Sequence, residues 1–336
     1  MSDNRKEAEA KMEKAIFISA DCWLCAFDLL SPRKLGLGIA LISHGFDFYV
    51  DEHFKTRKWT FGIIRIGSKI GKNGTKEMDV VNCYQRPMPI PQNPLPKKVV
   101  GFKAISLDYI DRNVIAFLHR FRQLFAVCPI NLSIQTARDD YRISEFILRN
   151  IWPMLGKNIH AIEMSVRIFN HLRQFVPSIL NECPPLRVVS FSVDLFIAFP
   201  TDDNAAASDG QAVAKWLFTP LQSNVPKVLR SPLDMNDGFL VSDIEDFKAA
   251  FASASSPVNF IVVIQFPPSF ANSVVPFVMT NELTREHLAL KRTKWNTSFL
   301  LIRCPIFHLR RLLALCLRIA SPASAWLWHC DDQPPF

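Results

Sequence analysis

The sequence predicts an α/β protein, in which a three-helix unit precedes a curved sheet of β/α repeats that ends in antiparallel strands. Three observations predict this order. Apolar residues recur at helical spacing near the N-terminus, a strand-like pattern then recurs about every 28 residues, and several short apolar runs joined by polar turns follow. The predicted segments are residues 14–56 (helical unit), 57–96 (hairpin and linker), 97–256 (β/α repeats), 257–306 (antiparallel strands) and 307–336 (basic helix and tail).

The composition is that of an ordinary folded protein. Of the 336 residues, 49% are hydrophobic and 21% are charged, whereas a disordered chain has far fewer apolar residues. The net charge of +8 is dispersed without a long basic block, so we expect a solvated surface and no nucleic-acid binding. The N-terminus lacks the apolar core of a secretory signal, and no apolar run is long enough to span a bilayer. We therefore expect a cytoplasmic or nuclear protein that is not secreted, with its eight cysteines reduced.

The N-terminal region is predicted to form short helices. In the stretch "ADCWLCAFDLL", Trp23, Phe27 and Leu30 lie at helical spacing. The pair Ser31-Pro32 ends this helix, because proline pushes the preceding residue out of the helical backbone conformation. The next segment, "KLGLGIALISHGFDFYVDEHF", repeats the apolar spacing through Leu35, Ile39, Ile42, Phe46 and Val50.

Two strand-like runs follow in "WTFGIIRIGSKIGKNGTKEMDVVNCY". They flank the dipeptide Asn73-Gly74, whose residues favour the tight turn of a β-hairpin. The next stretch holds five prolines between Pro87 and Pro96. Since proline cannot continue a helix or a central strand, we expect a linker there.

A pattern of apolar-x-x-apolar-x-apolar residues marks the repeat region. It begins at Phe102, Ile159 and Leu186, and in a weaker form at Pro129, so a new unit starts about every 28 residues. Amphipathic helical segments lie between, and Asp111 is the expected N-cap of "DRNVIAFLHRFRQLF". One strand and one helix per period are typical of a leucine-rich-repeat-like solenoid, whose stacked units bury each other's apolar faces. The polar stretch "TDDNAAASDG" is expected to be an exposed loop before one more strand–helix unit.

The C-terminal part changes character. The runs "VNFIVVIQF", "VVPFVMT", "EHLALKR" and "TSFLLIRC" are short and joined by polar turns, which predicts an antiparallel meander. The tail begins with "FHLRRLLALCLRIA", a predicted basic amphipathic helix. We expect this helix to pack on its own domain; the alternatives are a membrane surface or a partner protein.

Enzyme and metal motifs are absent from the sequence. The C-x-x-C pair Cys22 and Cys25 has no strand before it and lies in an apolar helical stripe, so packing explains it better than redox chemistry. The loop "GSKIGKNGT" does not match the phosphate-binding pattern G-x-x-x-x-G-K-[ST]. Ile66 stands where the first Gly is needed, and Asn73 follows Lys72 where Ser or Thr is needed. Cysteine and histidine residues gather near the C-terminus, but their spacing matches no standard zinc site. They are Cys304, His308, Cys316, His329 and Cys330. We expect no catalytic residue, no metal and no cofactor.

Residues 16–55 resemble an F-box, the short helical domain that docks its host protein on the adaptor of an SCF-type ubiquitin ligase. Ile18 stands at the start of the box. The positions that match the F-box pattern are Asp21, Trp23, Phe27, Leu30, Pro32, Leu35, Leu41, Ile42, Phe46 and Val50. The resemblance implies that these residues bind the adaptor. Three departures from the F-box pattern stand out. Ile18-Ser19 replaces the usual Leu-Pro, and Ala26 replaces the Ile beside Phe27. Gly36 and Gly38 lie inside the second helix, where each costs about 1 kcal/mol relative to Ala.

The chain as a whole, up to about Ile306, is similar to an expanded family of nematode F-box-like proteins. The phrases that carry this resemblance are "ALISHGFDFYVDEHFKTRKW", "PIPQNPLPKKVVGF", "QAVAKWL", "PVNFI", "VPF" and "LLIRCPI". The resemblance implies a non-catalytic substrate receptor, which joins a Skp-type adaptor and the cullin ligase core to a protein target that the sequence does not identify. The alternatives are a leucine-rich-repeat-like interaction scaffold without ligase association, and an enzyme that uses the thiols.

Overall fold

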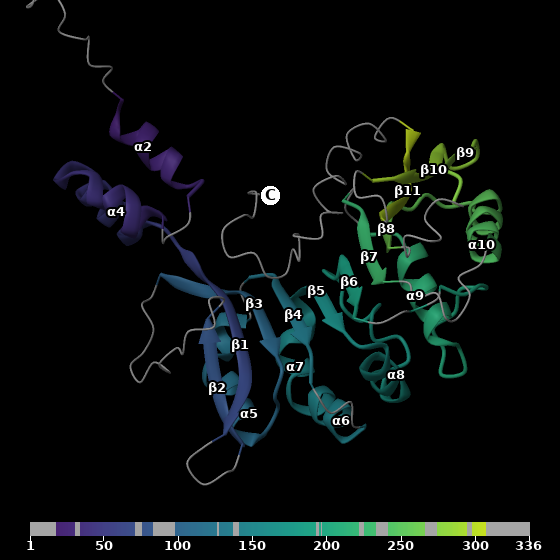
Figure 1. Cartoon of the computed structure of the whole chain (residues 1–336), viewed down its shortest axis with the longest axis horizontal. Coiled ribbons are helices and arrows are strands. Elements are labelled where there is room, and N and C mark those ends of the chain that lie inside the picture. Colours follow the sequence, from purple (N-terminus) through teal and green to yellow (C-terminus); the bar gives the residue numbers. More distant parts are fainter. Residues whose placement is uncertain are drawn as a thin grey trace, which may run out of the picture. The chain divides into compact units, whose positions relative to one another are not determined.

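The computed structural model of the chain divides into two compact units, with the boundary between Trp59 and Thr60 (Figure 1). The predicted turn at Asn73-Gly74, most of the proline-rich linker and the C-terminal basic helix lie outside the residues that the structure describes. The described residues are 18–30, 34–70, 76–82, 98–125, 128–136, 141–192, 195, 197–221, 225–232, 241–265, 274–293 and 298–306.

The described part of the first unit, hereafter the helical unit, contains two α-helices with two short helical turns between them. These elements are α2 (Ala20–Phe27), the π-helical turn η1 (Leu35–Ile39), the 3-10 turn η2 (Ala40–Ile42) and α4 (His44–Thr56). Each α-helix begins after a serine that caps it. The hydroxyl of Ser19 accepts a hydrogen bond from the amide of Cys22 at 3.4 Å, and that of Ser43 accepts one from the amide of Phe46 at 3.3 Å.

The second predicted helical segment is therefore divided into irregular turns and one regular helix. Gly36 and Gly38 lie in the π-helical turn, and glycine disfavours a regular α-helix because it loses more backbone conformational entropy than other residues. Ser43 then takes an extended backbone conformation, with φ −164° and ψ 162°, and starts α4 afresh as its N-cap. The periodicity therefore predicted correctly that this segment is helical, but it did not predict that Ser43 divides it into separate helical elements.

A small apolar core holds the helical unit together. Phe27, Leu35 and Val50 are each only 1% exposed, and they come from α2, η1 and α4 respectively. Around them, the ring of Trp23 meets the ring of Phe46 edge-on at a centroid distance of 4.8 Å. Three separate segments therefore depend on the same few side chains for their packing.

The second unit, hereafter the sheet unit, is built on one eleven-stranded sheet with the order β2-β1-β3-β4-β5-β6-β7-β8-β11-β10-β9. The strands are β1 (Trp59–Ile70), β2 (Lys76–Asn82), β3 (Val99–Leu107), β4 (Ile130–Ile134), β5 (Ile159–Met164), β6 (Val188–Phe191), β7 (Lys227–Pro232), β8 (Phe260–Gln265), β9 (Phe277–Asn281), β10 (Glu286–Arg292) and β11 (Ser298–Pro305). The predicted hairpin strands are confirmed, since β1 and β2 pair antiparallel with Ile70 opposite Lys76.

The strands from β3 to β8 are parallel to one another, as the repeat predicts. Their central apolar side chains lie in one register row across the six strands, and each is buried. This row consists of Ile105, Leu132, Ile162, Val189, Leu229 and Val262. The strand-like triplets of the sequence thus stack side by side, which gives a mixed α/β unit with a large, mostly parallel sheet.

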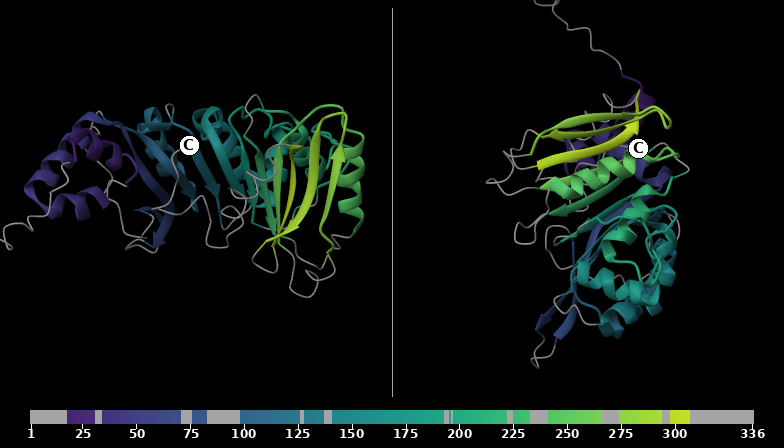
Figure 2. Two further views of the ribbon diagram at one scale, coloured as in Figure 1. Left: turned by 90° about the horizontal axis from the view of Figure 1, so that it is seen from above. Right: turned by 90° about the vertical axis from the view of Figure 1, so that its right-hand side faces the viewer.

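Helices connect the parallel strands and cover one face of the sheet, where their apolar sides join the buried row in a single core (Figures 1 and 2). The expected cap at Asp111 is confirmed, because its carboxylate accepts a hydrogen bond from the amide of Val114 at 2.8 Å. The helical elements are α5 (Arg112–Arg120), η3 (Arg122–Phe125), α6 (Tyr141–Asn150), α7 (Trp152–Leu155), η4 (Gly156–Asn158), α8 (Val166–Phe175), α9 (Asp209–Phe218) and α10 (Val241–Ala252).

The antiparallel end of the sheet is not a simple meander from β8 onward. Strands β9, β10 and β11 do form a meander, but β11 and not β9 pairs with β8. The burial of the strands explains this order. From Ser298 to Cys304 every side chain of β11 is buried, whereas β9 alternates between partly buried and exposed side chains until Asn281. The unbroken apolar run Phe299–Ile302 of β11 thus lies between two strands, and β9 forms the edge.

Candidate functional site

The most distinctive surface feature of the helical unit is a set of exposed apolar side chains. Its members, hereafter the exposed apolar set, range from 43% to 76% exposed. Scattered apolar residues are normal on a protein surface, but six in so small a unit make this set the candidate for a surface that binds another protein. The set consists of Ile18, Leu29, Leu37, Leu41, Ile42 and Phe48.

Helix α4 shows why the sequence leaves these side chains outside. Phe46, Val50 and His53 lie at helical spacing and face the small core. Phe48 lies off that spacing and is 61% exposed. The outer side of α4 is otherwise polar, so Phe48 is the large apolar side chain that this helix leaves available to a partner.

The predicted adaptor-binding residues divide into three groups. Ile18, Asp21, Leu41 and Ile42 are exposed, and Trp23, Leu30 and Phe46 are partly buried. Phe27, Leu35 and Val50 are buried in the core of the helical unit, so they hold the unit together and offer no surface to a partner in this conformation. Pro32 lies outside the described residues. The predicted set does not include the exposed residues Leu29, Leu37 and Phe48. The signal that could have found them is the excess of apolar residues over what one core face requires.

A charged pair joins the ends of the two α-helices. Asp28, the C-cap of α2, forms an ion pair with Arg57, the C-cap of α4. His53 lies beside this pair, with its Nδ1 atom 3.9 Å from the Asp28 carboxylate and its ring edge-on to Phe27. Burial lowers the pKa of His53, the positive charge of Arg57 lowers it further, and Asp28 opposes both effects. The imidazole is therefore held neutral as part of the core.

The prediction that the two cysteines of the C-x-x-C pair serve in packing is wrong. Cys22 and Cys25 are both exposed free thiols on α2, so neither fills a gap in the core. The physical reason is the helical phase: the buried side of α2 is set by Phe27 with Trp23 and Leu24 beside it, and both thiols lie off that side. The hydroxyl of Ser19 lies 3.3 Å from the Cys22 sulfur.

A second candidate surface is the face of the parallel strands opposite the helices. One register row across β3 to β7 carries polar side chains on this face: Ser106, Ser133, Glu163, Ser190 and Arg230. The two charged members are two strands apart. Burial lowers the pKa of the Arg230 guanidinium to about 10, and the Glu163 carboxylate opposes that shift. Both serines of β3 and β4 are buried, whereas Glu163 and Ser190 are partly exposed.

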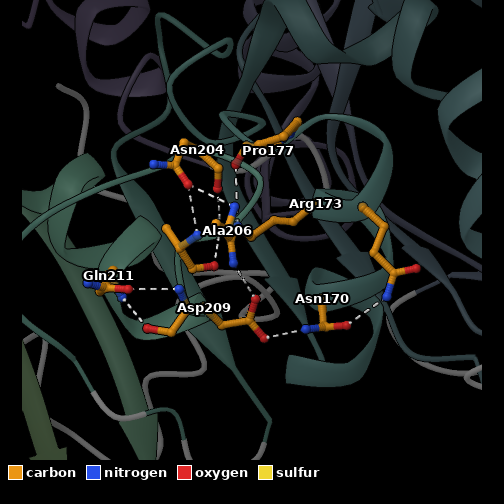
Figure 3. Close-up of polar contacts among 10 residues, drawn as sticks. Asn170, Arg173, Pro177, Asn204, Ala206, Asp209 and Gln211 are labelled. Atoms are coloured by element: carbon orange, nitrogen blue, oxygen red, sulfur yellow. Dashed lines mark hydrogen bonds and ion pairs between the residues drawn. The ribbon is translucent and has the colours of Figure 1, made fainter.

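A buried arginine joins α8 to the start of α9, as Figure 3 shows. Arg173 is 6% exposed and donates to the Asp209 carboxylate at 2.7 Å, and to the carbonyls of Pro177, Asn204 and Ala207. Asp209 also accepts a hydrogen bond from Asn170 at 3.1 Å. These bonds use four of the five N–H donors of the Arg173 guanidinium and both oxygens of the Asp209 carboxylate. The network therefore holds α8 and α9 together, and neither charged group is available for a reaction.

Lys227, at the start of β7, caps the end of the preceding helix. Its ammonium is 4% exposed, lies over the ring of Trp216 and donates hydrogen bonds to the carbonyls of Trp216 and Thr219. These carbonyls belong to the C-terminal end of α9, which carries a partial negative charge. Burial nevertheless lowers the pKa of the Lys227 ammonium to about 8.

The depressed pKa of Lys227 predicts a pH dependence of stability. Between pH 8 and pH 10.5 the unfolded chain keeps a proton that the folded chain has released, so the free energy of unfolding should rise with pH through this group. The rise should reach about 3 kcal/mol at most. Urea denaturation at several pH values gives the free energy of unfolding of the wild type and of a Lys227→Met variant. The contribution of Lys227 is the difference between the two slopes of this free energy against pH.

Lys215 provides the matched control, because it is exposed and lies on α9, the helix whose end Lys227 caps. A Lys215→Met variant should follow the pH dependence of the wild type. Equal slopes for the wild type and Lys227→Met would contradict the expectation, and they would mean that the helix carbonyls restore the ordinary pKa of the ammonium.

Metal sites and membrane spans were both sought among the described residues. No group of three His, Cys, Asp or Glu side chains in that part of the chain is arranged to bind a metal ion. No helix there combines the length and apolar character that crossing a bilayer requires. Comparison of the sequence and fold with models of known families, with curated proteins and with solved structures found no significant match.

Proposed function

We propose that the chain is a substrate-receptor subunit of an SCF-type ubiquitin ligase, which docks on a Skp-type adaptor through the helical unit and binds a target protein with the sheet unit. The observation that carries this proposal is the exposed apolar set of the helical unit, which includes Leu41 and Ile42 from the F-box-like pattern. The division of the chain into a small helical unit and a separate β/α unit also supports it.

The docking contact would be driven by the removal of apolar surface from water. Full burial of a Leu or Ile side chain contributes about 1.5–3 kcal/mol before the costs of association. Leu41 is 76% exposed and Ile42 is 62% exposed, so both retain most of that contribution for a partner. Phe27, Leu35 and Val50 support the contact indirectly, by holding η1 and η2 against α4.

The sheet unit would provide the target-binding part. Its repeated strand–helix units support a leucine-rich-repeat-like arrangement, in which the face opposite the helices binds a protein. Glu163 and Ser190 are partly exposed on that face and would provide polar contacts to a target segment. No chemical step is then needed from this chain, because holding the target near the ubiquitin-carrying enzyme raises its effective concentration.

Substitution of Leu41 and Ile42 tests the proposal. In co-purification with purified Skp-type adaptor, the Leu41→Asp/Ile42→Asp double variant should bind at least about tenfold more weakly, because the loss of one buried apolar contact costs 1.4 kcal/mol or more. Since both residues are exposed, the helices should stay folded, and circular dichroism checks this. Ile70→Asp is the matched control, because Ile70 is 79% exposed and lies on the sheet unit.

The outcome also separates this proposal from an interaction scaffold without ligase association. The inward packing of Phe27, Leu35 and Val50 favours that second function, because it is what a simple helical cap would need. A scaffold should show no adaptor binding in the wild type at any concentration. Equal recovery of the wild type and the double variant would show that the exposed apolar set does not bind the adaptor.

A further inference from the structure

One edge of the sheet ends in a strand that is open to pairing. Strand β9 is last in the sheet order and pairs with β10 alone among the described strands (Figures 1 and 2). Along its outer side, alternate backbone N–H and C=O groups of an edge strand point away from the sheet. Such a row of unpaired groups is a template for an added strand, so the side chains of β9 decide whether pairing is favoured.

The side chains of β9 do not protect this edge. The strand sequence, Phe277–Asn281, contains no charged residue, whereas protected edges commonly carry lysine or another inward-pointing charge. Val278 is 55% exposed on the strand itself. Val275, just before β9, and Leu283, just after it, are 78% and 75% exposed. Apolar side chains thus extend past both ends of the open edge.

We propose that β9 pairs antiparallel with β9 of a second copy of this chain, around a two-fold axis at Met279. In an antiparallel pair centred on one residue, positions equally far before and after it lie opposite each other. Val278 then lies opposite Thr280 of the partner copy. Val275 lies toward the end of the partner strand that carries Leu283. Pairing in this register therefore places a side chain of the second copy beside each of Val275, Val278 and Leu283, the three most exposed apolar side chains described at this end of the sheet unit.

The same register brings no like charges together. Val278 and Thr280 are both β-branched, and such cross-strand pairs stabilise a sheet. Phe277 lies opposite Asn281, whose amide is already committed to the carbonyls of Phe251 and Ala254 at the end of α10. Charged groups lie beside the strand and not on it: the Lys248 ammonium of α10 is 4.5 Å from the centroid of the Phe277 ring, and Glu282 and Arg285 are in the turn that follows β9. This self-complementarity favours a second copy over an unrelated strand, and the inference is independent of the proposed function.

Sedimentation velocity of the full chain over a range of concentrations tests the proposal. The wild type should show a monomer–dimer equilibrium. Val278→Lys should raise its dissociation constant at least tenfold, because the two introduced ammonium groups would lie on diagonal positions of the paired strands and repel each other. Ile70→Lys, at a residue that is 79% exposed on β1, should dimerise like the wild type. A wild type that stays monomeric at its solubility limit, or a Val278→Lys variant that dimerises equally well, overturns the proposal.

A cross-link then tests the register. In a Cys22→Ser/Cys25→Ser background, Met279→Cys should form a disulfide between two copies under oxidised glutathione, because residues directly opposite in an antiparallel pair have Cα atoms within the span of a disulfide. Mass spectrometry should find a peptide linked through position 279 in both copies. Val275→Cys should give no link to itself, and a 275–275 link would overturn the two-fold axis at Met279.

Discussion

Replacement of Glu286 by alanine should lower the free energy of unfolding of the sheet unit by about 3–5 kcal/mol. Glu286 and Arg303 form a buried ion pair, since they are 1% and 0% exposed. One oxygen of the carboxylate accepts hydrogen bonds from Arg303 Nε at 3.1 Å and Nη2 at 2.6 Å, and the other accepts one from the amide of Val258 at 2.8 Å. The substitution would leave the Arg303 charge buried without its counter-ion.

The surroundings of Arg303 offer little compensation for that loss. Its guanidinium lies over the rings of Phe218 and Phe251, at 5.5 and 5.2 Å from their centroids, and donates to the carbonyl of Ser256 at 2.9 Å. Its Nη1 atom has no hydrogen-bond partner within the described part of the chain. Aromatic faces and one carbonyl stabilise a cation far less than a carboxylate does, so the isolated charge should remain costly.

Urea denaturation of Glu286→Ala measures the effect, with Glu282→Ala as the exposed control from the adjacent turn. The double variant Glu286→Leu/Arg303→Met should recover most of the lost stability, because it removes both charges and fills the space with apolar atoms. If the double variant is as unstable as Glu286→Ala, the cost comes from lost packing or the lost contact to Val258, and the ion-pair explanation is wrong.

This ion pair also shows where prediction from the sequence ends. The strands of the repeat region and the Asp111 cap could be predicted, because alternation and capping depend on residues close together in the chain. The pairing of β11 with β8 could not, since strand order depends on contacts between distant segments. Glu286 and Arg303 meet only through that order. Nothing local in the sequence marks either residue as buried.

The candidate docking surface was predictable only in part, for a related reason. The apolar stripe of residues 20–50 identified the segment that carries most of the exposed apolar set. Periodicity does not state which apolar residues a small unit uses for its own core. Phe27, Leu35 and Val50 turn inward, while Leu29, Leu37 and Phe48 remain outside. Which apolar residues turn inward depends on how η1 and η2 pack against α4. Gly36 and Gly38 in η1 and the Ser43 cap of α4 contribute to that arrangement.

Phe27→Ala should have the largest effect on the helical unit. Truncation of a buried phenylalanine costs about 3–5 kcal/mol through lost transfer free energy and the cavity left behind. Phe27 is 1% exposed and contacts the edge of His53 at a centroid distance of 5.8 Å. A unit this small buries a low fraction of its surface and has little stability to lose. We therefore expect the helical unit to unfold, while the sheet unit, with its separate core, stays folded.

Hydrogen exchange measured by mass spectrometry distinguishes the two units. In Phe27→Ala, amides of α2 and α4 should lose protection, while amides of β5 and β6 should keep that of the wild type. Adaptor binding should disappear together with this protection, although Phe27 contacts no partner directly. Leu29→Ala, at a residue that is 71% exposed, should keep the protection and weaken adaptor binding alone. If Phe27→Ala keeps both its protection and its binding, the small core does not hold the exposed apolar set in place, and the physical basis of the docking proposal fails.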